Sequence, residues 1–234
     1  MPFDYTVRES GRAKHVRFRV SVQDGLVVVV PKGFDQARIP AMVEERKTWI
    51  RRALSEIAGL RAGMADPSDR PDQIELAALN EVWSLVWQPG TRLREGRDGT
   101  LHLDPSGEWR QALRRWLIRK AKAVLLPQVI QLSKELGVRV DRVIVRCQKT
   151  RWGSYSTRRT VSLNAQLLFL RSELVRYVLV HELCHARHPN HSPSFWKEVA
   201  RWEPAAQQLR NELRDGWRQV PFWLSTGGSS EDSE

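Results

Sequence analysis

The segment His181-Glu182-Leu183-Cys184-His185, followed six residues later by His191, constrains the fold of this chain more than any other feature. Four of the six histidines lie between positions 181 and 191. Residues four apart share one face of an α-helix, with about 5–6 Å between their Cβ atoms. The segment therefore predicts a helix through His185, a break at Pro189-Asn190, and a loop that returns His191 toward the first two histidines.

This spacing is typical of a metal site. A catalytic zinc ion takes three protein ligands and keeps a fourth position open for water. His181, His185 and His191 are the predicted ligands, and zinc is the predicted cofactor. Glu182 follows the first ligand, so its carboxylate is placed to take a proton from the activated water as a general base.

Other residues near the motif have competing interpretations. The third ligand could be Glu198 or Glu203 from the following helix, but the spacing favours His191. His188 could support the site or an oxyanion, although an exposed histidine at a helix end is the favoured interpretation. Cys184 is predicted to be a small core side chain, because it points away from the two helical histidines.

The amino-acid composition indicates the cellular compartment of the protein. The two cysteines, Cys147 and Cys184, make a disulfide framework unlikely and fit a reducing compartment. The N-terminus lacks the apolar stretch of a signal peptide. The longest apolar runs, such as residues 26–30, are too short to span a bilayer. We therefore expect a cytoplasmic protein with no membrane partner.

The net charge of +11 is concentrated in one part of the chain. Residues 109–160 hold fourteen Lys and Arg against two acidic residues. A basic surface of this kind attracts nucleic acid or other polyanions, and the predicted contacts are Arg115, Arg119 and Lys122. The alternative, equally weighted, is a solvated helix face without a partner.

The pattern of apolar residues predicts three parts: a β-rich part at 1–107, a core at 108–224, and a disordered acidic tail at 225–234. The first part should contain a hairpin around Asp24-Gly25, a helix over 40–58 after it, and short strands over 74–78, 82–87 and 101–103.

The core should begin with a helix from Glu108 that Pro127 kinks or divides, and that Leu136-Gly137 ends. A strand over 140–145 and a hairpin around residues 157–159 follow. Ser172 is the predicted N-cap of the histidine-bearing helix. Ser192-Pro193 should begin the next one, as a cap followed by proline at the first helical position.

Several segments together resemble the YgjP-like metallopeptidases, which are zinc-dependent hydrolases related to the WLM and SprT-like proteases. They are Arg151-Trp152-Gly153-Ser154, Val161-Ser162-Leu163-Asn164, Tyr177-Val178, the run HELCHARHPNHSPSFW from His181 to Trp196, and the N-terminal hairpin. The resemblance implies zinc on His181, His185 and His191, with Glu182 catalytic. It covers most of residues 5–217 and is strongest over 149–202.

The chain departs from this family pattern at two places. Tyr155 follows the RWGS segment, where a small residue or cysteine is usual, and Thr157-Arg158-Arg159 occupies a turn that often contains glycine. The histidine spacing also matches metzincins. However, Met1, Met42 and Met64 are the only methionines, so no methionine turn can follow the helix.

The RWGS segment has a functional and a structural interpretation. A strand beside the zinc helix could pair with an extended substrate, and Arg151, Tyr155 and Asn164 are the candidate substrate or oxyanion contacts. Trp152 and Gly153 are more simply explained as packing residues, with Trp152 wedging the sheet onto the helix.

These observations predict an α+β protein with a zincin-like core, made of a mixed sheet and an active-site helix, and an N-terminal β-rich arm. The predicted activity is zinc-dependent hydrolysis of peptide bonds in a protein or peptide substrate. One alternative is a zinc hydrolase of a non-peptide substrate, such as RNA or a small amide. Another is a nucleic-acid-associated protein with a structural zinc site.

Overall fold

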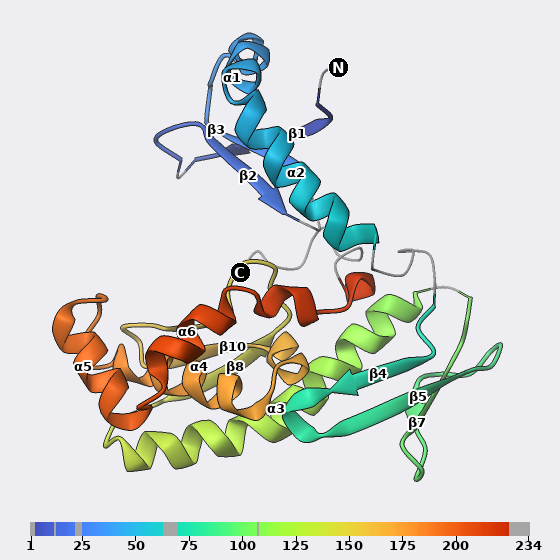
Figure 1. The fold of residues 1–234 in the computed structure, drawn as a ribbon. Coiled ribbons are helices and arrows are strands. Elements are labelled where there is room, and N and C mark those ends of the chain that lie inside the picture. The colour runs from blue at the N-terminus through green and yellow to red at the C-terminus, as the bar shows by residue number, and fades with distance from the viewer. Residues whose placement is uncertain (1–2, 12, 22–24, 63–69, 107, 225–234) are drawn as a thin grey trace. The chain divides into compact units, whose positions relative to one another are not determined.

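A computed structural model describes residues 3–11, 13–21, 25–62, 70–106 and 108–224. The protein has the expected mixture of helices and sheets (Figure 1). It forms two compact units, residues 1–69 and 70–234. This division differs from the expected boundary at 107/108, because the strands of residues 73–103 share a hydrophobic core with the helix that begins at Trp109. The predicted acidic tail lies outside the described residues.

Unit 1 contains a three-stranded sheet with the order β1-β3-β2. Its strands are β1 (Tyr5–Ser10), β2 (Arg17–Ser21) and β3 (Gly25–Pro31). The antiparallel pairing of β2 with β3 confirms the predicted hairpin, although Asp24 in its turn lies outside the described residues. Strand β1 pairs parallel with β3 and was not predicted, because its sequence alternates only weakly between buried and exposed positions.

Two helices pack on this sheet in place of the single helix predicted over 40–58. They are α1 (Ile39–Glu45) and α2 (Lys47–Ala62), preceded by the short helix η1 (Gln36–Arg38). Arg46 leaves the helical conformation between them. The small core of unit 1 joins apolar residues of β3 to those of the helices: Leu26, Val28, Val30, Ile39, Val43 and Ile50.

Unit 2 begins with a four-stranded sheet of order β4-β5-β7-β6. Its strands are β4 (Gln73–Leu76), β5 (Glu81–Trp87), β6 (Arg94–Glu95) and β7 (Thr100–Leu103), with the short helix η2 (Ala77–Leu79) after β4. Trp83 and Leu85 are buried on one face of β5, as their alternation predicted. That face packs in the same core as the following helix.

Helix α3 (Trp109–Glu135) continues through Pro127, so of the two predicted outcomes, a kink or a division, the division did not occur. Proline removes one helical hydrogen bond and disfavours a helix interior. Here the flanking residues Leu125 and Val129 are fully buried, so tertiary packing on both sides holds the helix together. Gly137 then adopts φ +61°, the left-handed conformation that commonly ends a helix.

The second sheet has the order β8-β10-β9. Its strands are β8 (Arg142–Arg146), β9 (Gly153–Tyr155) and β10 (Thr160–Asn164). Because β10 pairs parallel with β8 and antiparallel with β9, the sheet is mixed and β9 lies at its edge. The predicted hairpin around residues 157–159 is confirmed. Arg159 takes φ +54° there, at the turn where relatives often have glycine.

The short helix η3 (Ala165–Phe169) leads into the C-terminal helices. These are α4 (Ser172–Cys184), α5 (Pro193–Trp202) and α6 (Ala206–Leu213), followed by η4 (Gly216–Gln219) and η5 (Phe222–Leu224). Ser172 is the first helical residue and Arg171 is the N-cap, which corrects the predicted cap by one residue. The Ser192 cap is confirmed, since its Oγ accepts from the Phe195 N–H.

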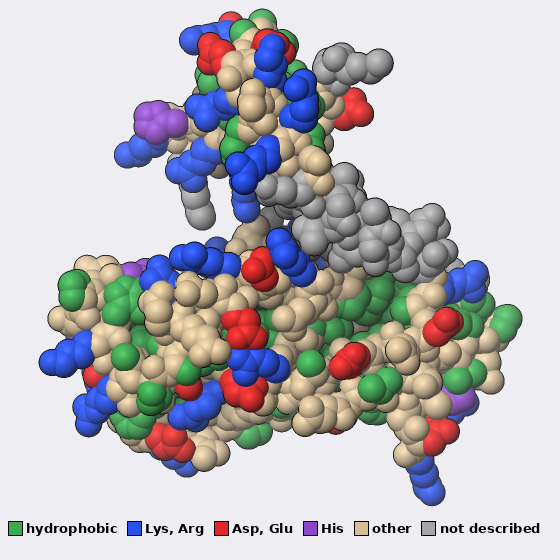
Figure 2. Space-filling view, viewed as in Figure 1, with side chains coloured by type: hydrophobic (Ala, Val, Ile, Leu, Met, Phe, Trp, Pro, Cys, Tyr) green, Lys and Arg blue, Asp and Glu red, His purple; other side chains and the backbone are tan. Residues whose placement is uncertain are grey.

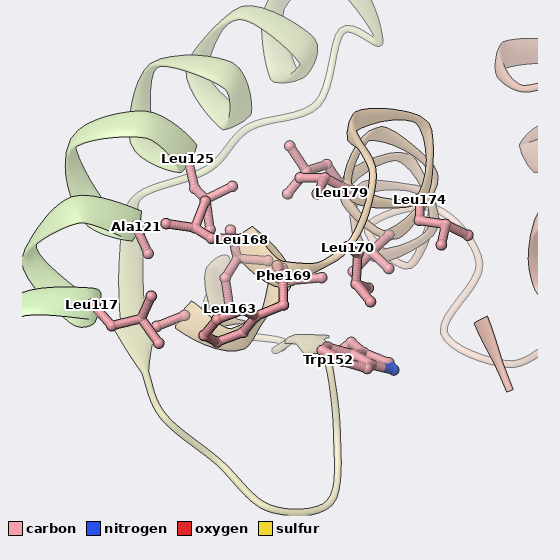
Figure 3. Close-up of a cluster of buried hydrophobic side chains, with 14 of the residues drawn as sticks. Leu117, Ala121, Leu125, Trp152, Leu163, Leu168, Phe169, Leu170, Leu174 and Leu179 are labelled. Atoms are coloured by element: carbon pink, nitrogen blue, oxygen red, sulfur yellow. The ribbon is translucent and has the colours of Figure 1, made fainter. Parts of the chain in front are cut away.

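The core of unit 2 lies between α3 and α4. Figure 3 shows Leu117, Ala121 and Leu125 of α3 pointing toward Leu163 and Leu168, with Leu179 of α4 on the opposite side. Truncating one such leucine to alanine typically costs about 2–5 kcal/mol. The histidine-bearing helix is therefore anchored in the hydrophobic core of the unit. Among the described residues, none of the helices has the length and apolarity needed to cross a membrane.

Candidate metal centre

The three predicted ligands come together at the end of α4. One ligand atom from each of His181, His185 and His191 lies within 4.8 Å of the other two. The Nε2 atoms of His181 and His191 are 3.1 Å apart. Two imidazole nitrogens that face each other at this distance need a proton or a cation between them, since their lone pairs repel. The geometry fits a zinc ion, which binds histidine nitrogens at about 2.0–2.1 Å.

A backbone carbonyl orients the second ligand. His185 caps the C-terminus of α4, and its Nδ1 lies 3.0 Å from the carbonyl oxygen of His188. An Nδ1–H that donates to this carbonyl leaves the Nε2 lone pair for a metal, the usual arrangement of a ligating histidine. His188 therefore supports the site through its backbone.

Aromatic side chains of α5 form the floor beneath the histidines. The Phe195 ring centroid lies 4.9 Å from those of His181 and His191, and 4.6 Å from that of His185. Trp196 stacks on His191 at 5.5 Å and 22°. The helix that follows Ser192 thus holds the third histidine, which is itself exposed, against the other two.

The environment of His181 and His191 favours their neutral form. Burial, together with the neighbouring His185 and His191, lowers the pKa of His181 to about 3. Burial and His185 also lower the pKa of His191. A neutral imidazole is the form that binds a metal ion, so these two side chains are ready to act as ligands at neutral pH.

The two alternative ligands are occupied elsewhere. Glu198 accepts from Arg187 at 2.7 Å and from the Trp202 indole at 3.2 Å. Glu203 pairs with Arg176 at 3.3 Å. Both carboxylates compensate arginine charges, and neither belongs to the histidine cluster.

Glu182 lies beside the histidines in a tightly enclosed position. It is 8% exposed. Burial raises the pKa of its carboxyl group to about 7, whereas the backbone N–H of Tyr155 and the charge of Arg151 act in the opposite direction. A Cβ atom added to Gly153 would lie 2.7 Å from Glu182 Cγ and 2.9 Å from Oε1. The absence of a side chain on β9 therefore makes room for this carboxylate.

The neighbouring tryptophan has the expected structural role. Trp152 is buried and stacks on Trp217 of η4, with ring centroids 4.0 Å apart at 17°. This stacking ties the start of β9 to the C-terminal segment. Arg151 is exposed and lines the pocket beside the metal cluster.

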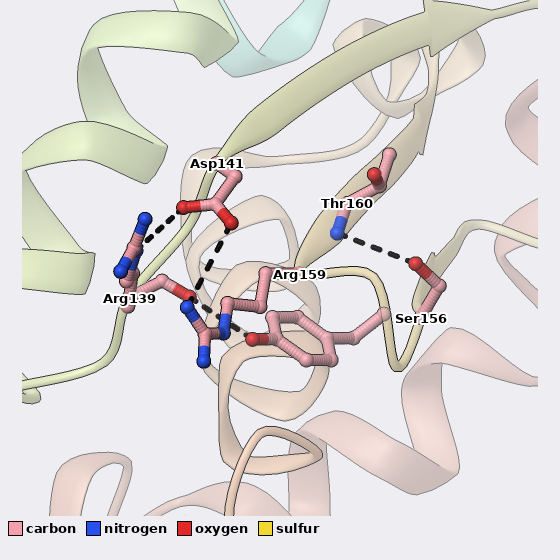
Figure 4. Close-up of polar contacts among 6 residues, drawn as sticks. Arg139, Asp141, Ser156, Arg159 and Thr160 are labelled. Atoms are coloured by element: carbon pink, nitrogen blue, oxygen red, sulfur yellow. Dashed lines mark hydrogen bonds and ion pairs between the residues drawn. The ribbon is translucent and has the colours of Figure 1, made fainter.

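The Tyr155 side chain is held by a backbone group. Its hydroxyl donates to the Arg139 carbonyl at 3.0 Å. Figure 4 shows the neighbouring charges, with Asp141 between Arg139 and Arg159. The backbone N–H of Tyr155 interacts with Glu182, and a role of Tyr155 as a substrate or oxyanion contact stays a prediction.

Asn164 has a structural role. It is fully buried. Its Nδ2 donates to the carbonyls of Gln148 and Arg151, at 2.7 and 2.9 Å, and its Oδ1 accepts from the Gln166 N–H. These bonds hold the loop before β9 and cap η3, and a contact of Asn164 with substrate stays a prediction.

A pocket of about 490 Å³ opens beside the histidines. Tyr177 and Arg210 are among the lining residues that were not predicted as site residues. Tyr177 lies one helical turn before His181, with their ring centroids 5.9 Å apart. Arg210 of α6 lines the pocket and its guanidinium lies 4.2 Å from the Trp196 ring. The helical spacing could have indicated Tyr177, but no local pattern marks Arg210.

The basic residues of α3 divide into two groups. Arg110 lies over the Trp109 ring, Arg114 donates to the Cys147 carbonyl, and Lys120 pairs with Glu81. These three serve the fold. The predicted polyanion contacts are exposed: Arg115, Arg119 and Lys122. Arg115 and Arg119 line a hollow that also contains Arg92, Asp104 and Glu108.

Both cysteines are buried free thiols. Cys147 accepts a contact from the Gln166 amide at 3.1 Å. Burial raises the pKa of the Cys184 thiol to about 12. Cys184 is thus the core residue that its position on the helix predicted.

The chain was compared with protein families, curated proteins and solved structures. The model of the YgjP-like metallopeptidase domain matches residues 14–216. None of the curated proteins compared with the chain matches it. Among solved structures, the metallopeptidase zymogen jannalysin of Methanocaldococcus jannaschii is 20% identical over 38% of this chain and 92% of its own, with a TM-score of 0.35.

The metallopeptidase zymogen abylysin of Pyrococcus abyssi is 26% identical, over 46% of this chain and 97% of its own, with a TM-score of 0.33. The family match extends far beyond the histidine motif. It includes the N-terminal hairpin, the RWGS segment and the C-terminal helices. The resemblance seen in the sequence is confirmed, and the chain belongs to the YgjP-like metallopeptidase family.

Proposed function

We propose that this protein is a zinc-dependent peptidase in which His181, His185 and His191 hold the metal and Glu182 acts as general base. The observation that carries the proposal is the convergence of three imidazole nitrogens within 4.8 Å, next to a buried carboxylate. Three nitrogen donors leave one tetrahedral position of zinc open, which is typical of a catalytic site. Bound zinc would polarise the scissile carbonyl and acidify water.

Glu182 supplies the proton transfers. Its carboxylate takes a proton from the attacking water and passes it to the leaving amine nitrogen. The Tyr155 N–H donates a hydrogen bond to this carboxylate, and the absence of a side chain on Gly153 leaves it room. These two contacts hold the base in one place, and accurate placement is a large part of catalysis.

Positive charge lines the same pocket. The guanidinium groups of Arg151 and Arg210 are placed to stabilise the oxyanion that forms as water attacks the carbonyl. Arg210 is held by its contact with the Trp196 ring at 4.2 Å. The buried Tyr177 forms part of the pocket wall beside His181.

The exposed edge of strand β9 favours the proposal of a peptide substrate and of a zincin-like core. The Trp152 carbonyl and the Ser156 N–H bond to β10. Because successive residues of a strand alternate, the backbone groups of Gly153 and Tyr155 face the other way. An extended peptide could pair with Gly153 at this edge and so present its scissile bond to Glu182.

Two alternatives make different predictions. A zinc hydrolase of RNA or a small amide would use the same metal. Such an enzyme has less need of a carboxylate directly after the first ligand, so the presence of Glu182 favours the peptidase. A structural zinc site is usually closed by four ligands, and the described residues offer three. Nucleic-acid contact through Arg115, Arg119 and Lys122 stays a prediction.

The test combines metal analysis with hydrolysis assays. The purified protein should contain one zinc ion per chain and cleave an unfolded protein or a peptide library, but not RNA or small amides. Glu182→Gln should lower the rate about 10²–10⁴-fold while zinc content stays the same. Glu173→Gln, an exposed glutamate of the same helix, is the matched control. Full peptidase activity of Glu182→Gln would remove Glu182 from the mechanism.

A further inference from the structure

Unit 1 carries an exposed tryptophan that its fold does not explain. Trp49 of α2 is 48% exposed, and it is the only aromatic among the large apolar side chains exposed in the described part of the chain. An exposed indole does not contribute the free energy of folding that it would contribute if it were buried in the core. Ile50, the next residue, is fully buried in the core of this unit, and Trp49, about 100° further around the helix, lies outside that buried face.

Arginines surround this indole. A hollow of about 550 Å³ is lined by Val16, Arg17, Phe18, Arg19, Arg46 and Trp49. Arg17 and Arg19 alternate with Phe18 along β2 and are exposed. Arg46, at the break between α1 and α2, lies with its guanidinium 5.1 Å from the Phe18 ring. Among the described residues, none that lines this hollow is acidic. Figure 2 shows Lys and Arg side chains spread over the displayed face of unit 1.

Among the described residues, ion pairs do not explain these arginines as part of the fold. In the described ranges of the chain, none of Arg17, Arg19 and Arg46 forms an ion pair with a carboxylate, unlike the neighbouring Lys47, which pairs with Glu44. Three positive charges on exposed positions around one flat ring are complementary to a ligand with several negative charges and a flat unsaturated part.

We infer that single-stranded nucleic acid binds this hollow, with a base stacked on Trp49 and backbone phosphates on Arg17, Arg19 and Arg46. Proteins that bind single strands without sequence preference combine a basic groove with aromatic stacking platforms. A duplex keeps its bases stacked on one another and offers none to the indole. An acidic peptide would meet the arginines but leave Trp49 unused. The inference is independent of the proposed peptidase activity.

The surface of α3 provides a matched comparison. It also presents three exposed cations, Arg115, Arg119 and Lys122. The hollow beside two of them contains the acidic residues Asp104 and Glu108, and its aromatic residue, Trp109, is buried. If charge alone decides binding, the two surfaces should contribute equally. If stacking matters, unit 1 should dominate.

The experiment measures binding of the full-length protein to a fluorescent oligothymidylate by anisotropy at low salt. Trp49→Ala should weaken binding about 5- to 100-fold, the effect of losing one stacked base, whereas Trp49→Phe should keep most of the affinity. The triple variant Arg17→Gln/Arg19→Gln/Arg46→Gln should bind weakly. Its affinity should depend less steeply on salt, by about 2 in the log–log slope, because each contact with a single strand contributes about 0.7.

The control is Arg115→Gln/Arg119→Gln/Lys122→Gln, which removes the same charge from α3 and should bind like the wild type. All variants should keep the circular dichroism spectrum and zinc content of the wild type, since every changed side chain is exposed. The inference is wrong if the wild type does not bind, if Trp49→Ala binds as tightly as the wild type, or if the α3 variant loses as much affinity. Equal competition by polyglutamate would also overturn it, because that outcome would identify an acidic-peptide surface.

Discussion

The metal side and the carboxylate side of the candidate site are built in different ways. The three histidines lie within eleven residues, and a helix, a short turn and the Ser192 cap bring them together. The surroundings of Glu182 come from Gly153 and Tyr155 on β9, and the pocket charge comes from Arg151 and from Arg210 on α6. The metal side therefore depends on local geometry, and the carboxylate side depends on how distant segments pack.

This difference should separate metal binding from catalytic activity, two properties that are often lost together in metalloenzymes. Changes on the histidine side should remove the metal. Changes on the side of β9 and α6 should leave the metal bound and reduce activity alone. The following variants test that separation.

The largest expected effect is on metal affinity. His191→Ala should weaken zinc binding more than about 100-fold. Mutating a residue that only hydrogen-bonds to a metal ligand already lowers metal affinity about 10–100-fold, and loss of the ligand itself should cost more. Competition with a chromophoric chelator measures the affinity. Glu203→Ala, which breaks only the contact with Arg176, is the control and should bind zinc nearly as well as the wild type. A zinc-free Glu203 variant beside a zinc-loaded His191 variant would show that the ligand assignment is wrong.

The next effect is on activity alone. The Cβ atom in Gly153→Ala would lie 2.7 Å from Glu182 Cγ, so the carboxylate must move. A displacement of about 1 Å can cost about 10²-fold in rate, and kcat should fall by this order while zinc content stays unchanged. Ser154→Ala, one residue further on the same strand, should be close to wild type. If the two variants are equally active, β9 does not position the base.

A smaller effect is expected from Arg210. Arg210→Met should lower kcat/KM about 10-fold. This loss is smaller than the roughly 10²–10³-fold fall in rate that follows removal of a buried oxyanion donor, because the Arg210 side chain is exposed. Zinc affinity should not change. Arg214→Met, also exposed and next to the same helix, is the comparison. Equal activity of the two variants would assign Arg210 to packing against Trp196 only.

The smallest effect concerns the ion pair that joins the start of α4 to α6. Arg171 forms two hydrogen bonds with Glu212, both at 2.6 Å. These bonds, more than the opposing effect of burial, lower the pKa of the Glu212 carboxyl group. Because both side chains are more than a third exposed, Glu212→Gln should cost only about 0.5–1 kcal/mol at pH 7.

The pH dependence of this loss has a definite sign. A carboxyl group with a lowered pKa in the folded state stabilises the fold above its ordinary pKa of 4.5 and loses that contribution as pH falls through the lower value. Urea unfolding should therefore show a constant difference between wild type and Glu212→Gln at neutral pH, and a shrinking one in acid below 4.5. A difference that persists unchanged in acid would mean that the ion pair is not its source.

Local sequence was sufficient for the parts of the fold whose signals lie within a few residues. The β2–β3 and β9–β10 hairpins, the Ser192 cap and the end of α3 at Gly137 were all predicted. Strand β1 was missed because a partly exposed strand has little periodic signal. Local sequence did not decide between a kink and a division at Pro127, and the helix continues because the packing of Leu125 and Val129 outweighs the loss of one hydrogen bond.

The candidate site, like the fold, could be predicted from local sequence only in part. The motif from His181 to His191 determined which side chains could meet, because helical spacing and a turn are properties of the local chain. Only the tertiary structure decided that Asn164 holds the loop before β9, that the Tyr155 hydroxyl bonds to the Arg139 carbonyl, and that Arg210 lines the pocket. Those outcomes depend on which segments pack against one another, and packing is a property of the whole core that no short stretch of sequence encodes.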